Sequence, residues 1–188
     1  MRISEKALAH YPWYVRLLLR LQRRKYGRIL KPSLLWGRSP LLFLAMGAMF
    51  GVFERKRSPL DPVLRSLVMT RVSQINSCQF CVDFNSAALA TRAGSSEKIP
   101  DERERVALEY AEAMSISGRT VGDDLFARLS RQFDDDAIVE LTALVAFQNL
   151  SSKFNAALHV PAQGFCELSE RKTERPANVK DISRSRRL

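Results

Sequence analysis

The sequence predicts an all-α protein, and three observations lead to this fold class. Only eight Gly and eight Pro occur in 188 residues, strand-like alternation of apolar and polar residues is scarce, and capping residues bound a series of apolar segments. Hydrophobic residues make up 46% of the chain and charged residues 27%. This balance is typical of a soluble globular protein that is long enough to bury a sizeable core.

Two helices are expected in the N-terminal third of the chain. The spacing of apolar residues predicts a basic amphipathic helix over residues 8–26, with Trp13, Leu17 and Leu21 in its apolar stripe. The longest uncharged apolar run, PLLFLAMGAMFGVF, covers residues 40–53. At this length it is too short to span a bilayer, so we expect a buried core helix.

Five more helices are expected after the helix-starting sequence SPLDP at residues 58–62. They are a helix over 63–75, one from Cys78 to about Ala93 with Ser77 as its N-cap and Gly94 at its end, and one over 102–116 with an Asp101–Glu104 capping box. A short helix capped by Asp123 or Asp124 reaches Gln132, and a long one begins after Asp134–Asp136 and ends before Pro161.

The positive charge is concentrated at the two ends of the chain. Residues 1–57 carry thirteen Lys and Arg against two Asp and Glu, residues 58–170 carry ten against sixteen, and residues 171–188 carry seven against two. We therefore expect a basic N-terminal helical extension over 1–57 that packs on the core, a helical domain over 58–165, and a basic, mobile tail over 166–188.

The basic ends have two interpretations. They are either a solvated arm and tail, or they make a weak contact with an anionic membrane surface or an acidic partner. We expect no nucleic-acid partner, because no nucleic-acid-binding motif accompanies the charge. Three Cys residues without a signal-peptide pattern favour a reducing, cytoplasmic compartment.

The stretch SCQFCVDFNS, residues 77–86, places two cysteines three positions apart. On a helix Cys78 and Cys81 share one face, and the helix N-terminus favours the thiolate form, most directly at Cys78. Asn85 lies one turn beyond Cys81, where a polar group can hydrogen-bond a thiolate or a sulfenic acid. The pair is either a dithiol–disulfide centre, in which one thiolate attacks a peroxide or disulfide and the other resolves the intermediate, or two buried, inert thiols.

Other chemistries find little support in the sequence. Zinc needs four ligands, one CxxC pair supplies two, and His10, His159 and Cys166 show no matching spacing, so we expect no metal. No glycine-rich phosphate loop, HExxH motif or Ser-His-Asp arrangement is apparent, and we expect no cofactor. Cys166 is interpreted as structural, and His159 as a capping or surface residue.

Three segments resemble the carboxymuconolactone decarboxylase superfamily, specifically its alkylhydroperoxidase AhpD-like branch: LRSLVMTRVSQINSCQFCVDFNSAALATRAG, DERERVALEYAEAM and FDDDAIVELTALVAFQNLSSKFNAAL. The likeness covers about residues 60–160. It implies an AhpD-like helical domain that buries surface by forming a homo-oligomer. It also implies antioxidant peroxide reduction, with a small hydroperoxide or disulfide as substrate and a protein or small thiol as electron donor. By this resemblance Cys81 attacks and Cys78 closes the disulfide, whereas the helix terminus alone favours Cys78 as the more acidic thiol.

Two positions depart from the family pattern, which is Cys-x2-Cys-x3-His with an acidic residue twelve positions before the first Cys. Asn85 occupies the His position and Ser66 the acidic position. Neither side chain is a general base at neutral pH, and general acid–base help is commonly worth about 10²–10⁴ in rate. The chain is therefore a peroxidase or disulfide oxidoreductase without the family relay, or a weak or non-enzymatic member that binds partners or senses redox state through its basic ends.

Substitutes for the missing base are few. Asp83 lies on the opposite side of the helix from Cys81, so we do not expect it to act as the base. Three polar residues of the preceding helix remain candidates: Arg71, Ser73 and Gln74. Lys153 and Asn155 lie in a stretch that resembles the pocket-lining NRxN region of the family, where a positive charge and an amide orient a polar substrate or bind a neighbouring helix.

Overall fold

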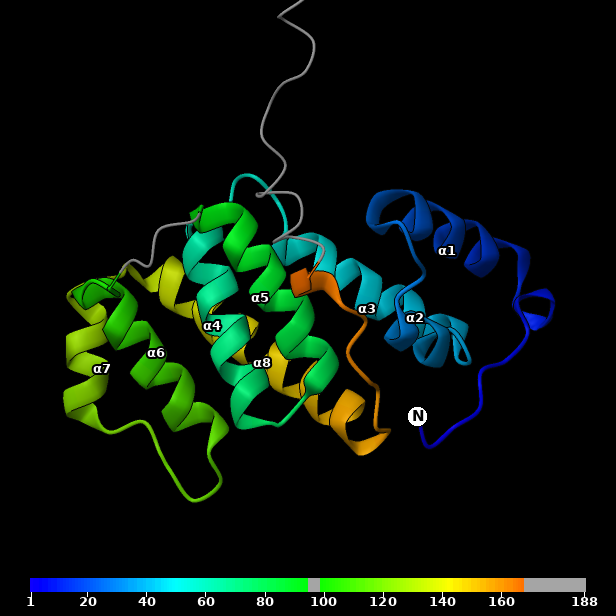
Figure 1. Cartoon of the computed structure of the whole chain (residues 1–188). Coiled ribbons are helices and arrows are strands. Elements are labelled where there is room, and N and C mark those ends of the chain that lie inside the picture. The colour runs from blue at the N-terminus through cyan, green and yellow to red at the C-terminus, as the bar shows by residue number, and fades with distance from the viewer. Residues whose placement is uncertain (95–98, 168–188) are drawn as a thin grey trace, which may run out of the picture.

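The computed structural model describes residues 1–94 and 99–167, and in these ranges it confirms the all-α fold (Figure 1). No β-strand occurs in this part of the chain. A 3₁₀ turn at Leu8–His10 precedes the helices α1 (Trp13–Tyr26), α2 (Lys31–Trp36), α3 (Pro40–Phe53), α4 (Pro62–Ile75), α5 (Gln79–Ala93), α6 (Glu102–Ser115), α7 (Asp123–Ser130) and α8 (Asp135–Ala157).

The main hydrophobic core lies where α4, α6 and α8 contact one another. Leu64, Val68 and Val72 follow at four-residue intervals on α4 and are buried in one cluster with Leu141 and Leu144 of α8. Fully burying such a side chain stabilises the fold by about 1.5–3 kcal/mol, so α4 is held firmly against α8. Because α5 packs along α4 (Figure 1), this core also positions the start of α5, where the two cysteines lie.

The helix-starting aspartates behave largely as the sequence predicts. Asp101 forms the predicted capping box of α6, and Asp134 accepts a hydrogen bond at the start of α8. The predicted cap of the short helix α7 is wrong, because its N-cap is Gly122. Asp123 and Asp124 lie instead in the first turn, where their charges still interact favourably with the helix dipole.

The uncharged helix α3 is mostly exposed, so the expectation of a buried core helix is wrong. Only Met46 and Phe53 of its 14 residues are buried, whereas Leu41 is 80% exposed. The reason is architectural. α3 lies at the side of the helical body next to α2, and no element within the described ranges covers its outer side (Figure 1).

The predicted apolar stripe of the first helix is exposed as well. The helix begins at Trp13, after Pro12 at its N-cap, and it packs through Val15 and Leu19. Trp13 is 70% exposed, and Leu17 and Leu21 also face solvent. The sequence pattern identified an apolar side of this helix, but the fold buries the neighbouring side.

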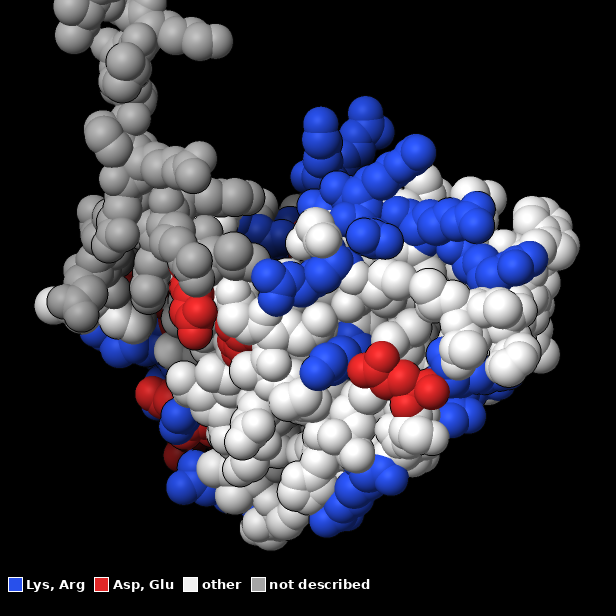
Figure 2. Space-filling view, turned by 45° about the vertical axis from the view of Figure 1, so that its right-hand side comes forward, with Lys and Arg blue, Asp and Glu red and all other residues white. Residues whose placement is uncertain are grey.

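Both helices expose apolar side chains, among them Trp13 and Leu17 of α1 and Leu41 of α3. Figure 2 shows Lys and Arg side chains gathered along one edge of a largely uncharged surface. Such a surface fits a second copy of the chain or an anionic membrane surface, and both partners stay predictions.

The division of the chain into segments at residues 57 and 165 also stays a prediction, and the tail from residue 168 lies outside the described residues. Among the described residues, no helix has the length and hydropathy needed to cross a membrane.

Candidate functional site

Cys78 and Cys81 form a disulfide at the N-terminus of α5, with their Cα atoms 5.2 Å apart. The chain reverses between α4 and α5 at Ser77, which adopts the left-handed backbone (φ 51°). Cys78 follows as the N-cap of α5, and its Sγ accepts a hydrogen bond from the Cys81 N–H at 3.1 Å. The expectation of Ser77 as the N-cap is therefore wrong by one residue, because Ser77 makes the turn and Cys78 makes the cap.

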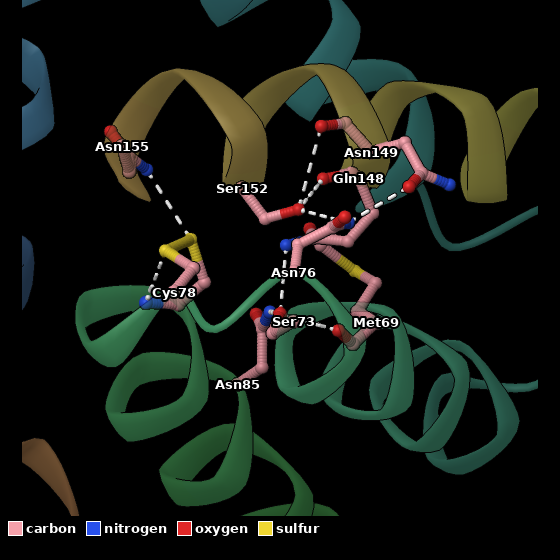
Figure 3. The surroundings of a disulfide bond; sticks show 10 residues. Met69, Ser73, Asn76, Cys78, Asn85, Gln148, Asn149, Ser152 and Asn155 are labelled. Atoms are coloured by element: carbon pink, nitrogen blue, oxygen red, sulfur yellow. Dashed lines mark hydrogen bonds between the residues drawn. A yellow bond between two sulfur atoms is a disulfide. The ribbon is translucent and has the colours of Figure 1, made fainter. Parts of the chain in front are cut away.

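The sulfur of Cys81 has an N–H donor from a distant helix. Asn155 of α8 donates its Nδ2 to Cys81 Sγ at 3.3 Å (Figure 3), and Asn155 Oδ1 is buried without a hydrogen-bond partner among the described residues. Both cysteines are nearly inaccessible, with Cys78 1% and Cys81 3% exposed. Each sulfur thus accepts one N–H hydrogen bond, a contact that stabilises a thiolate, whereas burial of the sulfur opposes that form.

Asn85 directs its side chain toward α4 rather than toward the sulfurs. Its Nδ2 donates to Ser73 Oγ at 3.0 Å, and Gln148 Nε2 donates to the same oxygen at 2.9 Å (Figure 3). Ser73 Oγ in turn donates to the backbone oxygen of Met69 at 2.6 Å. This buried network is fully neutral, and it contains no group that accepts a proton from a thiol near neutral pH.

The other two candidates on α4 contact different parts of the molecule. Arg71 Nε donates to Glu112 Oε1 of α6 at 2.7 Å, and Gln74 is exposed. Of the three polar residues proposed as substitutes for the base, only Ser73 lies in the network beside the disulfide.

Ser66 lies in a second polar group. Its Oγ accepts a hydrogen bond from Arg92 Nη1 at 2.7 Å, and Arg92 Nη2 pairs with Glu54 Oε2. Ser66 precedes Ser73 by seven residues, or about 10 Å along α4. The two positions that depart from the family pattern, Ser66 and Asn85, therefore have separate partners in this chain.

A cavity of about 730 Å³ connects the two polar groups. α1, α2, α3, α5 and α8 all contribute to its wall, which is predominantly apolar. Asn85 and Asn155 line it on the disulfide side, and Ser66, Arg92 and Glu54 also line it. Neither cysteine lines the cavity, but Asn155 connects its wall to Cys81 Sγ.

The remaining sequence candidates lie around this site. Lys153 and His159 are exposed, whereas Asn155 of the same family-like stretch is buried at the disulfide. Cys166 is partly buried, and its Sγ donates to the backbone oxygen of Asp83 at 3.2 Å. Sequence reasoning missed Arg92. The available signal was that Arg92 follows Ala88 by four residues, so the two side chains lie on the same face of the predicted helix.

Asp83 anchors the segment that follows α8. Its carboxylate accepts hydrogen bonds from the N–H groups of Gln163 at 2.8 Å and Cys166 at 2.9 Å. Burial alone would raise the pKa of the Asp83 carboxyl, but backbone N–H groups of Cys166, Phe165, Gln163 and Gly164 outweigh this effect and hold the pKa below its usual range. The carboxylate is therefore stabilised in the folded state as an anion.

Asp83→Asn is expected to destabilise the protein by about 1–3 kcal/mol at pH 7, because the amide accepts these N–H groups less well. A depressed folded-state pKa gives stability that is present above the unfolded pKa of about 3.9 and is lost as the pH falls through the folded value. The difference between wild type and variant should therefore shrink below about pH 4 in urea unfolding. Asp123→Asn is the control, because it removes only an exposed charge in the first turn of α7 and should cost at most about 1 kcal/mol. A difference in unfolding free energy between wild type and Asp83→Asn that is the same at pH 7 and below about pH 4 would contradict the assignment.

Three comparisons place this geometry among known proteins. The model of the carboxymuconolactone decarboxylase family matches residues 41–117. The chain is 46% identical over 177 residues to the uncharacterized protein YnjA of Escherichia coli (strain K12), covering 88% of this chain and 97% of that protein.

Solved structures share the fold at lower identity. An alkylhydroperoxidase AhpD core, an uncharacterized peroxidase-related protein from Ralstonia eutropha JMP134, is 22% identical with a TM-score of 0.77, covering 87% of this chain and 93% of that chain. The debrominase Bmp8, as a cysteine-to-alanine variant in complex with 2,3,4-tribromopyrrole, is 20% identical with a TM-score of 0.71, covering 86% of this chain and 92% of that chain. At these identities the likeness concerns the fold.

Proposed function

The chain belongs to the carboxymuconolactone decarboxylase family, and we propose that it is a thiol-dependent peroxidase or disulfide oxidoreductase acting through Cys78 and Cys81. The observation that carries the proposal is the cysteine pair itself. It closes as a disulfide at a helix N-terminus, each sulfur accepts an N–H donor, and a large apolar cavity reaches Asn155 beside it.

The reaction needs both cysteines in the reduced state. The Cys81 thiolate attacks the terminal oxygen of a hydroperoxide, an S–O bond forms as the O–O bond breaks, and the alkoxide leaves and takes up a proton as an alcohol. The Cys78 thiol then attacks the sulfenic acid of Cys81, which forms the disulfide and releases water. An external thiol returns both residues to the reduced state by exchange through a mixed disulfide and is itself oxidised.

The position of Asn155 supports Cys81 as the attacking residue. Asn155 lines the cavity and donates to Cys81 Sγ, so Cys81 is the cysteine whose sulfur contacts a residue of the cavity wall. Cys78 Sγ instead receives the N–H of Cys81 and caps α5. This assignment agrees with the family resemblance, and it places the resolving thiol at the helix N-terminus.

The shared fold does not select the chemistry, because one fold supports many reactions. Among the structural neighbours are a peroxidase-related protein and a debrominase. A second candidate function is therefore a weak or non-enzymatic member that senses redox state. Two observations favour it: both sulfurs are nearly buried, and neither Asn85 nor Ser66 supplies a base.

A stopped-flow thiol assay tests the proposal. Reduced protein is mixed with a small organic hydroperoxide from about pH 6 to about pH 9, the range in which free thiols ionise. We expect loss of both thiols of the pair per hydroperoxide, faster than free cysteine, with a rate that rises with pH because no side-chain base assists. Consumption no faster than free cysteine at every pH, with a disulfide that a reductant still opens, would favour the sensor instead.

A further inference from the structure

We infer that the cavity binds an elongated apolar substrate with an anionic head group, and that Arg92 holds this head group at the end away from the disulfide. The inference names a substrate class for the same site, and so for its reactive end it rests on the proposed function. A long-chain carboxylic acid that carries a hydroperoxide group on its chain has this chemistry.

The length of the cavity follows from the residues of α5 that line it. Phe80, Phe84, Ala88 and Arg92 recur every four residues and all contribute to the wall. Residues at this spacing lie on one face of a helix, and the twelve residues from Phe80 to Arg92 rise by about 18 Å. The cavity therefore extends along nearly the whole of α5 rather than surrounding the cysteines alone.

α3 also lines the cavity over a similar length. Its lining residues extend from Phe43 to Glu54, a rise of about 16 Å, and those between them include Met46 and Phe50. Glu54 at the end of α3 pairs with Arg92 at the end of the lining on α5, so the two walls meet at this ion pair. The region between the ion pair and the disulfide side is lined mainly by aliphatic and aromatic side chains, which suit an alkyl chain.

The far end of the cavity is suited to a carboxylate. The guanidinium of Arg92 presents several N–H donors in a planar fork, the geometry that pairs with carboxylates, and it already binds one carboxylate, that of Glu54. The Arg92 and Glu54 side chains are 25% and 43% exposed, so their ion pair contributes little to stability. A substrate carboxylate can therefore replace Glu54 on Arg92 at low cost, while Ser66 Oγ keeps its bond from Nη1.

The separation between the two ends matches this class of molecule. Cys81 and Arg92 are eleven residues apart on α5, a rise of about 16 Å. A head group bound at Arg92 thus places the distal part of a long chain beside Asn155, whose Nδ2 contacts Cys81 Sγ. A small hydroperoxide without a head group spans only a fraction of this distance and lacks the contact with Arg92.

Binding of a non-reactive probe tests the inference without any turnover. Dodecanoate and its methyl ester are titrated into the oxidised protein in a Trp13→Phe background, with fluorescence of the cavity-lining Trp36 as the readout. We expect dodecanoate to bind at least about tenfold more tightly than the ester, because only the acid carries a negative charge that pairs with the Arg92 guanidinium. Arg92→Gln should weaken binding of dodecanoate far more than binding of the ester, and so remove most of this preference.

Glu54→Gln is the matched second variant, and it should act in the opposite direction. Removing the competing carboxylate frees Arg92, so dodecanoate should bind several-fold more tightly and the ester should not change. Equal affinity for acid and ester in the parent protein, an equal weakening of both by Arg92→Gln, or no effect of Glu54→Gln on the acid would each overturn the inference. If dodecanoate binds through Arg92 but the protein does not reduce a hydroperoxide of a long-chain carboxylic acid, the proposed function fails while the binding site stands.

Discussion

Replacing Cys81 by serine is expected to abolish hydroperoxide reduction, whereas replacing Cys78 by serine should leave the first step intact and trap its product. The thiolate is the nucleophile of the reaction, so its loss from Cys81 should lower the rate by about 10³-fold or more. Cys78→Ser removes only the resolving thiol, and the sulfenic acid on Cys81 should then persist. Asn155 Nδ2, which donates to Cys81 Sγ, is unaffected by this substitution and still connects that sulfur to the cavity wall.

Two readouts check this assignment. Stopped-flow consumption of a hydroperoxide gives the rate of the first step, and mass spectrometry after trapping with a sulfenic-acid reagent identifies the modified residue. Cys166→Ser is the control, because Cys166 contacts Asp83 rather than the cysteine pair and should keep full turnover. A sulfenic acid on Cys78 in the Cys81→Ser variant would reverse the roles and support the helix N-terminus as the main source of reactivity.

Local interactions are the part of this structure that the sequence predicts well. The caps at Asp101 and Asp134 join side chains to N–H groups within three residues, so their signals lie next to each other in the chain. Ser77 shows the limit of such signals. Serine is a favoured N-cap residue, but the tight reversal between α4 and α5 places Ser77 in the left-handed backbone conformation. Cys78 is therefore the N-cap of α5.

Contacts between distant residues are the part that the sequence could not supply. The apolar pattern of α3 says that its side chains avoid water, but it does not say which surface covers them, and the expectation of a buried helix was wrong. The bond from Asn155 to Cys81 joins residues 74 positions apart, and the Arg92–Glu54 pair spans 38. The cysteine pair itself was visible because its two members lie within one helical turn.

Asn85→His is expected to raise the rate of peroxide reduction by about a hundredfold near pH 7, the lower end of the range for general acid–base catalysis. A histidine at this position lies one turn beyond Cys81 on the same helix and has an ordinary pKa of about 6.5, so it can take the thiol proton. The hydroxyl of Ser73, which now accepts from Asn85, remains as a hydrogen-bond partner for the imidazole. The pH–rate profile, measured by stopped flow, should gain an inflection near the histidine pKa.

The control is Asn85→Ala, which removes the amide without adding a base and should give no gain. A profile for Asn85→His that matches this control, in a variant that remains helical by circular dichroism, would mean that loss of the family base does not limit the rate. Adding Ser66→Glu should contribute little more, because Ser66 lies about 10 Å along α4 from Ser73 and contacts Arg92. A glutamate there would pair with that guanidinium rather than orient the new histidine, so we expect the missing base, and not the missing acidic residue, to limit proton transfer.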